Sequence, residues 1–173
     1  MKKLILEKVG NIVKNKEKLQ EVLPVEISHR GKELYIEGEP LEEYEAETVV
    51  RALDFGFAPE IAFLIKEREL ALEILSIKDF TKRKDMASIK ARIIGTKGKT
   101  LRTLTELTDC FFAVSNNEVG IIGHPEQMKM AQDAIASLIR GSKQANVYKF
   151  LEKHHIEPVV DFGLKEPKKK SKE

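Results

Sequence analysis

The ten residues RIIGTKGKTL (92–101) combine two glycines with strong positive charge. Gly95 and Gly98 enclose Thr96 and Lys97, and the segment contains no acid, histidine or thiol, which excludes acid–base, metal and thiol chemistry here. A GXXG turn between two helices lets two backbones approach closely, because glycine has no Cβ. The unpaired N–H groups at the start of the following helix carry positive partial charge and bind anions such as phosphate. We therefore predict a site for a phosphodiester chain.

Basic and apolar side chains surround this turn in a pattern suited to single-stranded RNA. The lysines and arginines add full charges, the apolar residues could floor a groove for unstacked bases, and the N–H groups of Gly98 and Lys99 are the expected donors to phosphate. A KH turn holds a nucleic-acid backbone in this way and clamps about four nucleotides. The predicted RNA-binding residues are Lys90, Arg92, Ile93, Ile94, Gly95, Thr96, Lys97, Gly98, Lys99, Thr100, Leu101 and Arg102.

Two other interpretations of the turn compete with RNA binding. A glycine-flanked connection between helices needs no ligand, but the basic block and the order of elements around the turn favour a binding site. The letters GKT (98–100) also end a nucleotide-binding P-loop, which requires a glycine five residues before Gly98. Ile93 occupies that position, so the sequence argues against an ATPase.

The other reactive residues form no recognisable catalytic or metal site. The four histidines show no metal-ligand spacing with a cysteine. The single cysteine, Cys110, starts a predicted strand and is expected to be packed rather than reactive. Glu42, Glu43, Glu45 and Glu47 crowd one predicted helix and read as a solvated acidic face. We expect no metal, no cofactor and no enzymatic activity.

Charge divides the 173 residues into two unequal halves. Residues 1–80 carry 12 Lys and Arg against 17 Asp and Glu, whereas residues 81–173 carry 18 against 11. Residues 81–102 hold eight basic residues and only one acid, Asp85, which favours a polyanionic partner. The acidic first half points instead to a protein partner or to no ligand. No apolar run approaches the ~20 residues of a membrane span, and the N-terminus does not resemble a signal peptide, so we expect a cytoplasmic location.

An internal repeat at an offset of 85 residues indicates a duplicated unit. Apolar positions coincide along the two copies, and so do the turn residues Gly38 and Gly123, Pro40 and Pro125, and Gly56 and Gly141. The first copy lacks an intact turn. On one register KNKE (14–17) replaces GTKG, and on the other GNIV (10–13) replaces it, and the second glycine is missing in both.

Hydrophobic periodicity predicts the same elements in both copies. In the second copy we expect strands over 72–80, 110–115 and 119–123, and helices over 86–95, 99–108, 125–141 and 142–155. In the first copy we expect strands over 3–7, 25–28 and 33–37, and helices over 41–56 and 58–70. The fold class is therefore α+β, with two three-stranded antiparallel sheets that are each packed by helices.

Three motifs of the second half resemble the tandem-KH assembly proteins of the small ribosomal subunit, the Dim/Pno/Krr group with its short archaeal relatives. They are RIIGTKGKT (92–100), IIGHPEQMKMA (121–131) and RGSKQANVYKFLE (140–152), of which the last is the most specific. DFGFAPEIAF (54–63) also resembles the bridge between the two KH units of that group. The resemblance implies two tandem type I KH domains, and the motifs do not separate the Dim/Pno branch from the Krr branch.

The domain organisation implied by this resemblance has three parts. Residues 1–69 would form a degenerate KH domain without GXXG plus a bridging helix, and residues 70–156 a KH domain with an intact GXXG and a C-terminal helical extension. Residues 157–173 have little apolar content at their end and are expected to be a disordered basic tail.

The function implied is that of a non-catalytic, single-stranded RNA-binding protein of rRNA processing. It would bind near the 3′ end of small-subunit rRNA and present it to a separate nuclease. The expected partners are pre-rRNA or small-subunit rRNA and an rRNA-maturation endonuclease or another ribosome or translation protein, with the chain itself a monomer away from membranes. The alternative is a protein–protein adapter on the pre-ribosome or translation machinery with only non-specific RNA binding.

Overall fold

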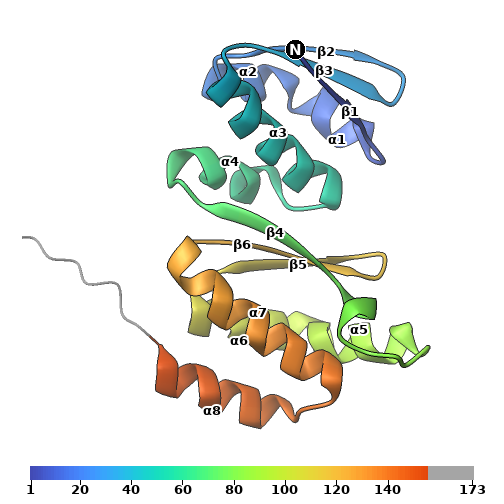
Figure 1. Cartoon of the computed structure of the whole chain (residues 1–173), viewed down its shortest axis with the longest axis vertical. Helices are drawn as coiled ribbons and strands as arrows, with labels where there is room; N and C mark the ends of the chain where they lie inside the picture. Colours follow the sequence, from blue (N-terminus) through green and yellow to red (C-terminus); the bar gives the residue numbers. More distant parts are fainter. Residues whose placement is uncertain (156–173) are drawn as a thin grey trace, which may run out of the picture.

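The structure is a computed structural model that describes residues 1–155, and it consists of two similar units stacked in one column (Figure 1). The first unit contains β1 (Lys2–Ile5), α1 (Val9–Lys14), α2 (Lys16–Val22), β2 (Glu26–Arg30), β3 (Glu33–Glu37), α3 (Pro40–Phe55) and α4 (Pro59–Glu67). The second contains β4 (Ala71–Ser76), η1 (Ile77–Asp79), α5 (Met86–Ile94), η2 (Thr96–Gly98), α6 (Lys99–Thr108), β5 (Phe111–Ser115), β6 (Glu118–Gly123), α7 (Pro125–Arg140) and α8 (Gln144–His154). Within residues 1–155, no helix is long and apolar enough to cross a bilayer.

The two sheets have the same topology. Their strand orders are β1-β3-β2 and β4-β6-β5, and every neighbouring pair is antiparallel. Layers alternate along the molecule: the first sheet, the helices of the first unit, the second sheet, then α5, α6 and α7, with α8 outermost (Figure 1). The predicted α+β fold with two three-stranded antiparallel sheets is confirmed.

The 85-residue repeat is visible in the helices that close each unit. α3 and α7 both have 16 residues and both begin with a proline, Pro40 or Pro125, whose missing N–H is harmless in the first turn. Gly56 and Gly141 end them with φ of 123° and 106°, a region that glycine enters without steric cost. The same offset maps β2 onto β5 and β3 onto β6.

Each unit has its own apolar core between its sheet and its helices. Leu19 and Ile36 are fully buried in the first core, and Leu104 and Ile121, 85 residues further on, are fully buried in the second. The coincidence of apolar positions in the sequence therefore reflects two copies of one packing scheme.

The units share a continuous interface, because the outer face of the second sheet packs against the first unit. Ile122 of β6 is fully buried in the first core, and Phe111 of β5 packs against that core as well. The absence of a side chain at Gly120 lets β6 pack closely against two aromatic rings of the first unit. A Cβ there would lie 2.7 Å from Phe57 Cε2 and 2.8 Å from Phe55 Cε1. The second sheet is thus covered on both faces.

Three predicted elements end two or more residues earlier than the periodicity indicated. The strand predicted over 3–7 ends at Ile5, because its partner β3 begins at Glu33, opposite Ile5. The strand predicted over 72–80 ends at Ser76, because its partner β6 begins at Glu118, opposite Ser76, and the Ile77 N–H donates instead to Asn117 O at 2.9 Å. The helix predicted over 58–70 ends at Glu67, because Glu69 adopts a positive φ of 53°. The proposed domain division at residues 69 and 70 falls between α4 and β4, and the predicted tail (157–173) lies outside the described residues.

The first unit has a helix junction where the second has its GXXG turn. α1 and α2 meet at Asn15, within KNKE (14–17), which selects that register over GNIV (10–13). The Asn15 amide donates to Asn11 O at 2.7 Å, and neither glycine is present. This junction therefore has no GXXG geometry.

Candidate nucleic-acid interface

The GTKG segment forms a tight turn between α5 and α6. Asp85 caps α5 by accepting a hydrogen bond from the Ser88 N–H at 3.2 Å, which fixes where the helix starts. The chain then leaves α5 at Gly95 with φ 74° and ψ 175°, and both Lys97 (φ 53°) and Gly98 (φ 73°) are left-handed before α6 begins. The predicted order of helix, GXXG turn and helix is confirmed.

The two glycines of the turn have different physical roles. A Cβ at Gly95 would lie 2.2 Å from Thr100 Oγ1 and 2.7 Å from Thr100 N, so only glycine allows α5 to end against the first turn of α6. A Cβ at Gly98 would meet no atom within 4 Å. Gly98 therefore supplies the left-handed conformation and leaves open space in front of the turn.

The backbone donors of the turn differ from those expected from the sequence. The Gly98 N–H donates to Gly95 O at 3.2 Å, and the Lys99 N–H donates to Thr96 O. These two groups close the turn and are not available to a phosphate. Within residues 1–155, the N–H groups of Thr96 and Lys97 make no hydrogen bond, so the free donors lie at the tip of the turn.

The predicted site residues fall into three classes of exposure. Those exposed to solvent are Thr96, Lys97, Lys99 and Arg102, and those half-buried are Lys90, Arg92, Ile94, Gly95, Gly98 and Leu101. Ile93 and Thr100 are buried, with Ile93 in the second core. Ile93 and Thr100 therefore support the turn from behind, whereas Ile94 and Leu101 remain available as apolar surface beside it.

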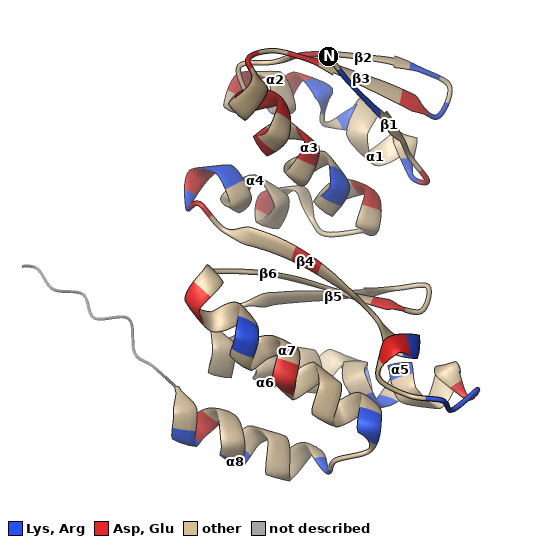
Figure 2. Cartoon of the chain, viewed as in Figure 1, with Lys and Arg blue, Asp and Glu red and all other residues tan. Residues whose placement is uncertain are grey.

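The positive charge of this region is not neutralised by the protein. Five of the six ion pairs found in residues 1–155 lie in the first unit, and the sixth joins Lys129 to Asp133 on α7. Figure 2 shows acidic and basic residues mixed on the first unit and basic residues gathered at the α5 end of the second. Arg102 donates to Lys97 O at 3.0 Å and so braces the tip of the turn.

Ser142, just before α8, and Gln144, at its start, also position the turn. Neither was among the site residues predicted from the sequence. The Arg92 guanidinium donates to Ser142 O, and the Gln144 amide donates to Arg92 O at 3.3 Å and Thr100 Oγ1 at 3.5 Å. The only sequence signal for this contact was the RGSKQANVYKFLE motif. Its apolar members Val147 and Leu151 are buried in the second core, which holds α8 against α6.

The thiol and the acids form neither an exposed nucleophile nor a metal-binding group in the part of the chain that the structure describes. Cys110 is fully buried, and this burial raises the pKa of its thiol to about 11, so the reactive thiolate is disfavoured. Within residues 1–155 no three His, Cys, Asp or Glu side chains are grouped as a metal site would require.

A family model described as the eukaryotic type KH-domain (KH-domain type I), specifically the second such domain of PNO1, matches residues 71–156. KH domain-containing protein MJ0443 of Methanocaldococcus jannaschii is 37% identical over 116 residues, which are 66% of this chain and 51% of that protein. Pre-rRNA-processing protein PNO1 of Yarrowia lipolytica is 33% identical over 102 residues, or 57% of this chain and 40% of that protein. The chain spans about half or less of the length of these curated relatives.

Solved structures agree over a longer stretch. Dim2p from Pyrococcus horikoshii OT3 superposes with a TM-score of 0.82 at 28% identity, covering 88% of this chain and 98% of that one. A chain of the a/eIF2alpha-aDim2p-rRNA complex from the same organism gives a TM-score of 0.81 at 28% identity, covering 88% of this chain and 92% of that one. Both units of the fold are therefore shared with these proteins.

The matching domain model is that of PNO1, and the similar proteins and solved structures include ones named PNO1 and Dim2p. With two type I KH folds in tandem, and an intact GXXG turn only in the second, this chain belongs to the Pno1/Dim2 family of KH-domain proteins.

Proposed function

We propose that this chain binds single-stranded RNA through the GXXG turn of its second unit. The observation that carries the proposal is the turn itself: free N–H groups at Thr96 and Lys97, open space in front of Gly98, and surrounding cations without acidic partners in residues 1–155. Backbone donors and unpaired cations together are what a phosphodiester backbone requires. The half-buried Ile94 and Leu101 offer apolar surface for unstacked bases.

The RNA that we propose is small-subunit rRNA or its precursor, bound near the 3′ end. One matched relative is named a pre-rRNA-processing protein, and one matched structure contains rRNA, which supports this assignment. In this role the chain acts in the cytoplasm as a non-catalytic, monomeric assembly factor of the small ribosomal subunit that presents the rRNA to a separate nuclease. The buried Cys110 and the lack of a grouped acid cluster in residues 1–155 fit a role without chemistry.

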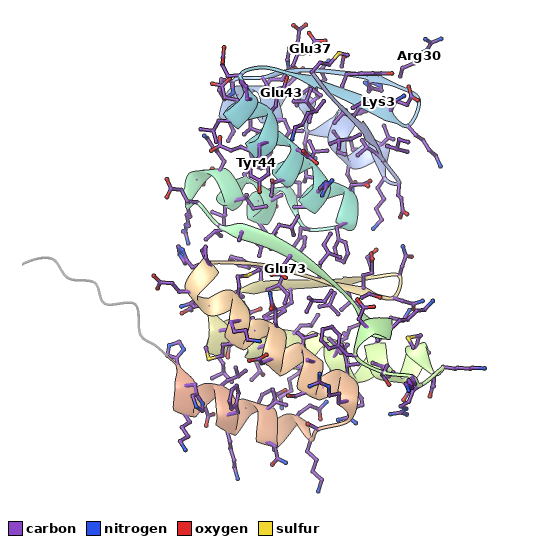
Figure 3. The ribbon with its side chains drawn as sticks, viewed as in Figure 1. Lys3, Arg30, Glu37, Glu43, Tyr44 and Glu73 are labelled. Carbon is purple, nitrogen blue, oxygen red and sulfur yellow. The ribbon has the colours of Figure 1, made fainter. Side chains whose placement is uncertain are left out.

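A second candidate function is protein docking by the acidic first unit. A cavity of about 440 Å³ lies between α3, α4 and β4, lined in part by Leu41, Tyr44 and Ile65. Leu41 and Tyr44 are 68% and 62% exposed, which is high for large apolar side chains, and Tyr44 lies on the surface between α3 and α4 (Figure 3). An adapter that used this surface alone would bind RNA weakly and independently of the turn.

The test of the proposed function is a titration of RNA from the small-subunit 3′ end with wild type and with Thr96→Asp/Lys97→Asp. Both side chains are exposed, and aspartate tolerates the left-handed conformation of residue 97, so the fold should be retained. Two new negative charges at the phosphate position should reduce affinity by about 100-fold or more. A scrambled RNA of the same length reports sequence preference.

Lys14→Asp/Lys16→Asp is the matched control, because it places two acids at the equivalent junction of the first unit. Its affinity should stay within about twofold of wild type, since that junction has no GXXG geometry. Equal losses in the two variants would show that only overall charge matters, and an undiminished affinity of Thr96→Asp/Lys97→Asp would move RNA binding away from the turn.

A further inference from the structure

The connection between β4 and α5 is where the second unit departs most from the first. Only residues 6–8 join β1 to α1, whereas residues 77–85 join β4 to α5. The longer connection contains η1 and then the run Lys82, Arg83 and Lys84. The first unit closes the same sheet topology without these residues, so the fold does not require them.

This connection forms one side of a shallow, open depression of about 650 Å³. The residues that line it are Lys78, Thr81, Lys82, Arg83, Lys84, Met86 and Asn117. Its four cations are exposed, and none of them forms an ion pair with any residue of 1–155. The neighbouring acids Asp79, Asp85 and Glu118 do not line it, and the Asp85 carboxylate is engaged as the cap of α5.

Backbone contacts hold the connection in place. The Ile77 side chain is fully buried, and its N–H donates to Asn117 O in the β5–β6 turn at 2.9 Å. Further along, the Arg83 N–H donates to Thr81 Oγ1 at 3.2 Å and the Met86 N–H to Lys84 O at 3.0 Å. The start of the connection is therefore anchored to the sheet, and local hydrogen bonds shape the basic run, which lowers the entropy lost when a ligand orders it.

α5 connects the depression to the GXXG turn. The two lie at opposite ends of this nine-residue helix, which is about 13 Å long. Between them the exposed side chains of α5 are those of Ala87, Ser88 and Ala91, spaced three and four residues apart and therefore on one side of the helix. Such small side chains leave room for a strand that runs from the turn to the depression.

We propose that this depression is a second phosphate-binding site, which holds the part of the RNA strand that flanks the nucleotides at the GXXG turn. The proposal rests on the proposed RNA-binding function and extends its footprint beyond the about four nucleotides that a KH turn clamps. Four unpaired cations with Met86 as the only large apolar side chain in the lining match a polyanion, whereas the cores of protein–protein interfaces are depleted of lysine.

RNAs of different length distinguish binding at the GXXG turn from binding at the depression. The experiment uses a core RNA of about four nucleotides and the same core extended by about eight nucleotides on its 5′ or on its 3′ side. We expect Lys82→Ala/Lys84→Ala to weaken one extended RNA by about tenfold and to reduce its salt slope by about 1.4, at ~0.7 per lost phosphate contact on a single strand. Binding of the core should stay within about twofold, because the core does not reach the depression.

Lys149→Ala/Lys153→Ala on α8 is the matched control, since it removes two exposed lysines from the same unit. An equal loss in the control and in the loop variant, an equal loss on the core and the extended RNAs, or no loss on either extension would each overturn the proposal. The two proposals fail separately. If the core RNA binds Thr96→Asp/Lys97→Asp as well as wild type, the proposed function fails, whatever the loop variant does.

Crosslinking provides a measurement that does not depend on a mutation. An extended RNA with photoreactive 4-thiouridine in the flank should crosslink to the segment 78–86, and the label placed in the core should crosslink near 92–102 instead. Flank crosslinks confined to other segments would overturn the second site even if affinity changed as expected.

Discussion

At the scale of single residues, the candidate site depends on two glycines that the sequence presents as equals. Gly95 has no room for a side chain, because Thr100 of α6 packs directly against it. Gly98 faces open space and is required for its left-handed backbone alone. The first glycine thus serves the packing of two helices, and the second serves the shape of the surface that a ligand meets.

Alanine substitutions should separate these two roles. Gly98→Ala should lower the free energy of unfolding by about 1 kcal/mol, the usual cost of a non-glycine residue in the left-handed region. Gly95→Ala should lower it by about 3 kcal/mol or more, because its φ and ψ are nearly restricted to glycine and its Cβ would overlap Thr100. Urea unfolding of both variants measures the difference, and equal losses would contradict the packing role of Gly95.

At the scale of elements, the turn is held by a helix that is distant in sequence. α8 packs against α6 and α7, and Gln144 at its start donates to Arg92 O of α5. The Arg92 guanidinium in turn donates to Ser142 O, just before α8. The Gln144 amide reaches both sides of the turn, since it contacts Arg92 O before the turn and Thr100 Oγ1 after it. The C-terminal extension is therefore part of what fixes the GXXG geometry.

Removal of this amide should loosen the turn without disturbing the core. Gln144→Ala should lower the free energy of unfolding by about 1 kcal/mol, the net value of a typical hydrogen bond. It should also speed hydrogen exchange at the Gly98 N–H, which closes the turn on Gly95 O. Asn146→Ala, an exposed change on the same helix, is the control and should affect neither measurement. Unchanged exchange in Gln144→Ala would assign α8 a purely packing role.

The sequence predicted those elements whose signals are local. Pro40 and Gly56 mark the start and end of α3, and alternating apolar residues predicted β3 over 33–37 as the structure has it. What it missed depends on partners that are distant along the chain. β4 stops at Ser76 because of where β6 begins, and Ile93, predicted as ligand surface, is buried by the second core. The contact of Gln144 with the turn likewise spans 52 residues and leaves no periodic trace.

At the scale of the whole molecule, the first unit covers the outer face of the second sheet and shields it from solvent. Phe55 and Phe57 of the first unit lie over Gly120 of β6 with their ring centroids 5.8 Å apart, and Ile122 enters the first core. The degenerate first unit therefore stabilises the sheet of the unit that carries the GXXG turn. This contribution to stability does not require RNA binding by the first unit itself.

A larger residue at position 120 should separate the two units. Gly120→Val would place its Cβ closer to both phenylalanine rings than van der Waals contact allows, and overpacking of this kind costs about 1–3 kcal/mol. Since each unit retains its own core, we expect urea unfolding to change from one cooperative transition to two, with the second unit less stable than in wild type. Circular dichroism and tyrosine fluorescence, followed on the same samples, should then give midpoints that no longer coincide.

RNA affinity shows whether Gly120→Val disturbs only the interface between the units or also the GXXG turn of the second unit. α5 and α6, which flank the GXXG turn, lie on the side of the second sheet away from the first unit (Figure 1), whereas a side chain at Gly120 would face Phe55 and Phe57 of the first unit. The affinity of Gly120→Val in the absence of denaturant should therefore stay within about threefold of wild type as long as the second unit remains folded. Gly10→Ala is the control, because Gly10 lies in a helix with nothing within 4 Å of its added Cβ, and it should not weaken the protein. A single coincident transition in Gly120→Val would mean that the two units form one cooperative core, in which the turn and the first unit gain and lose their structure together.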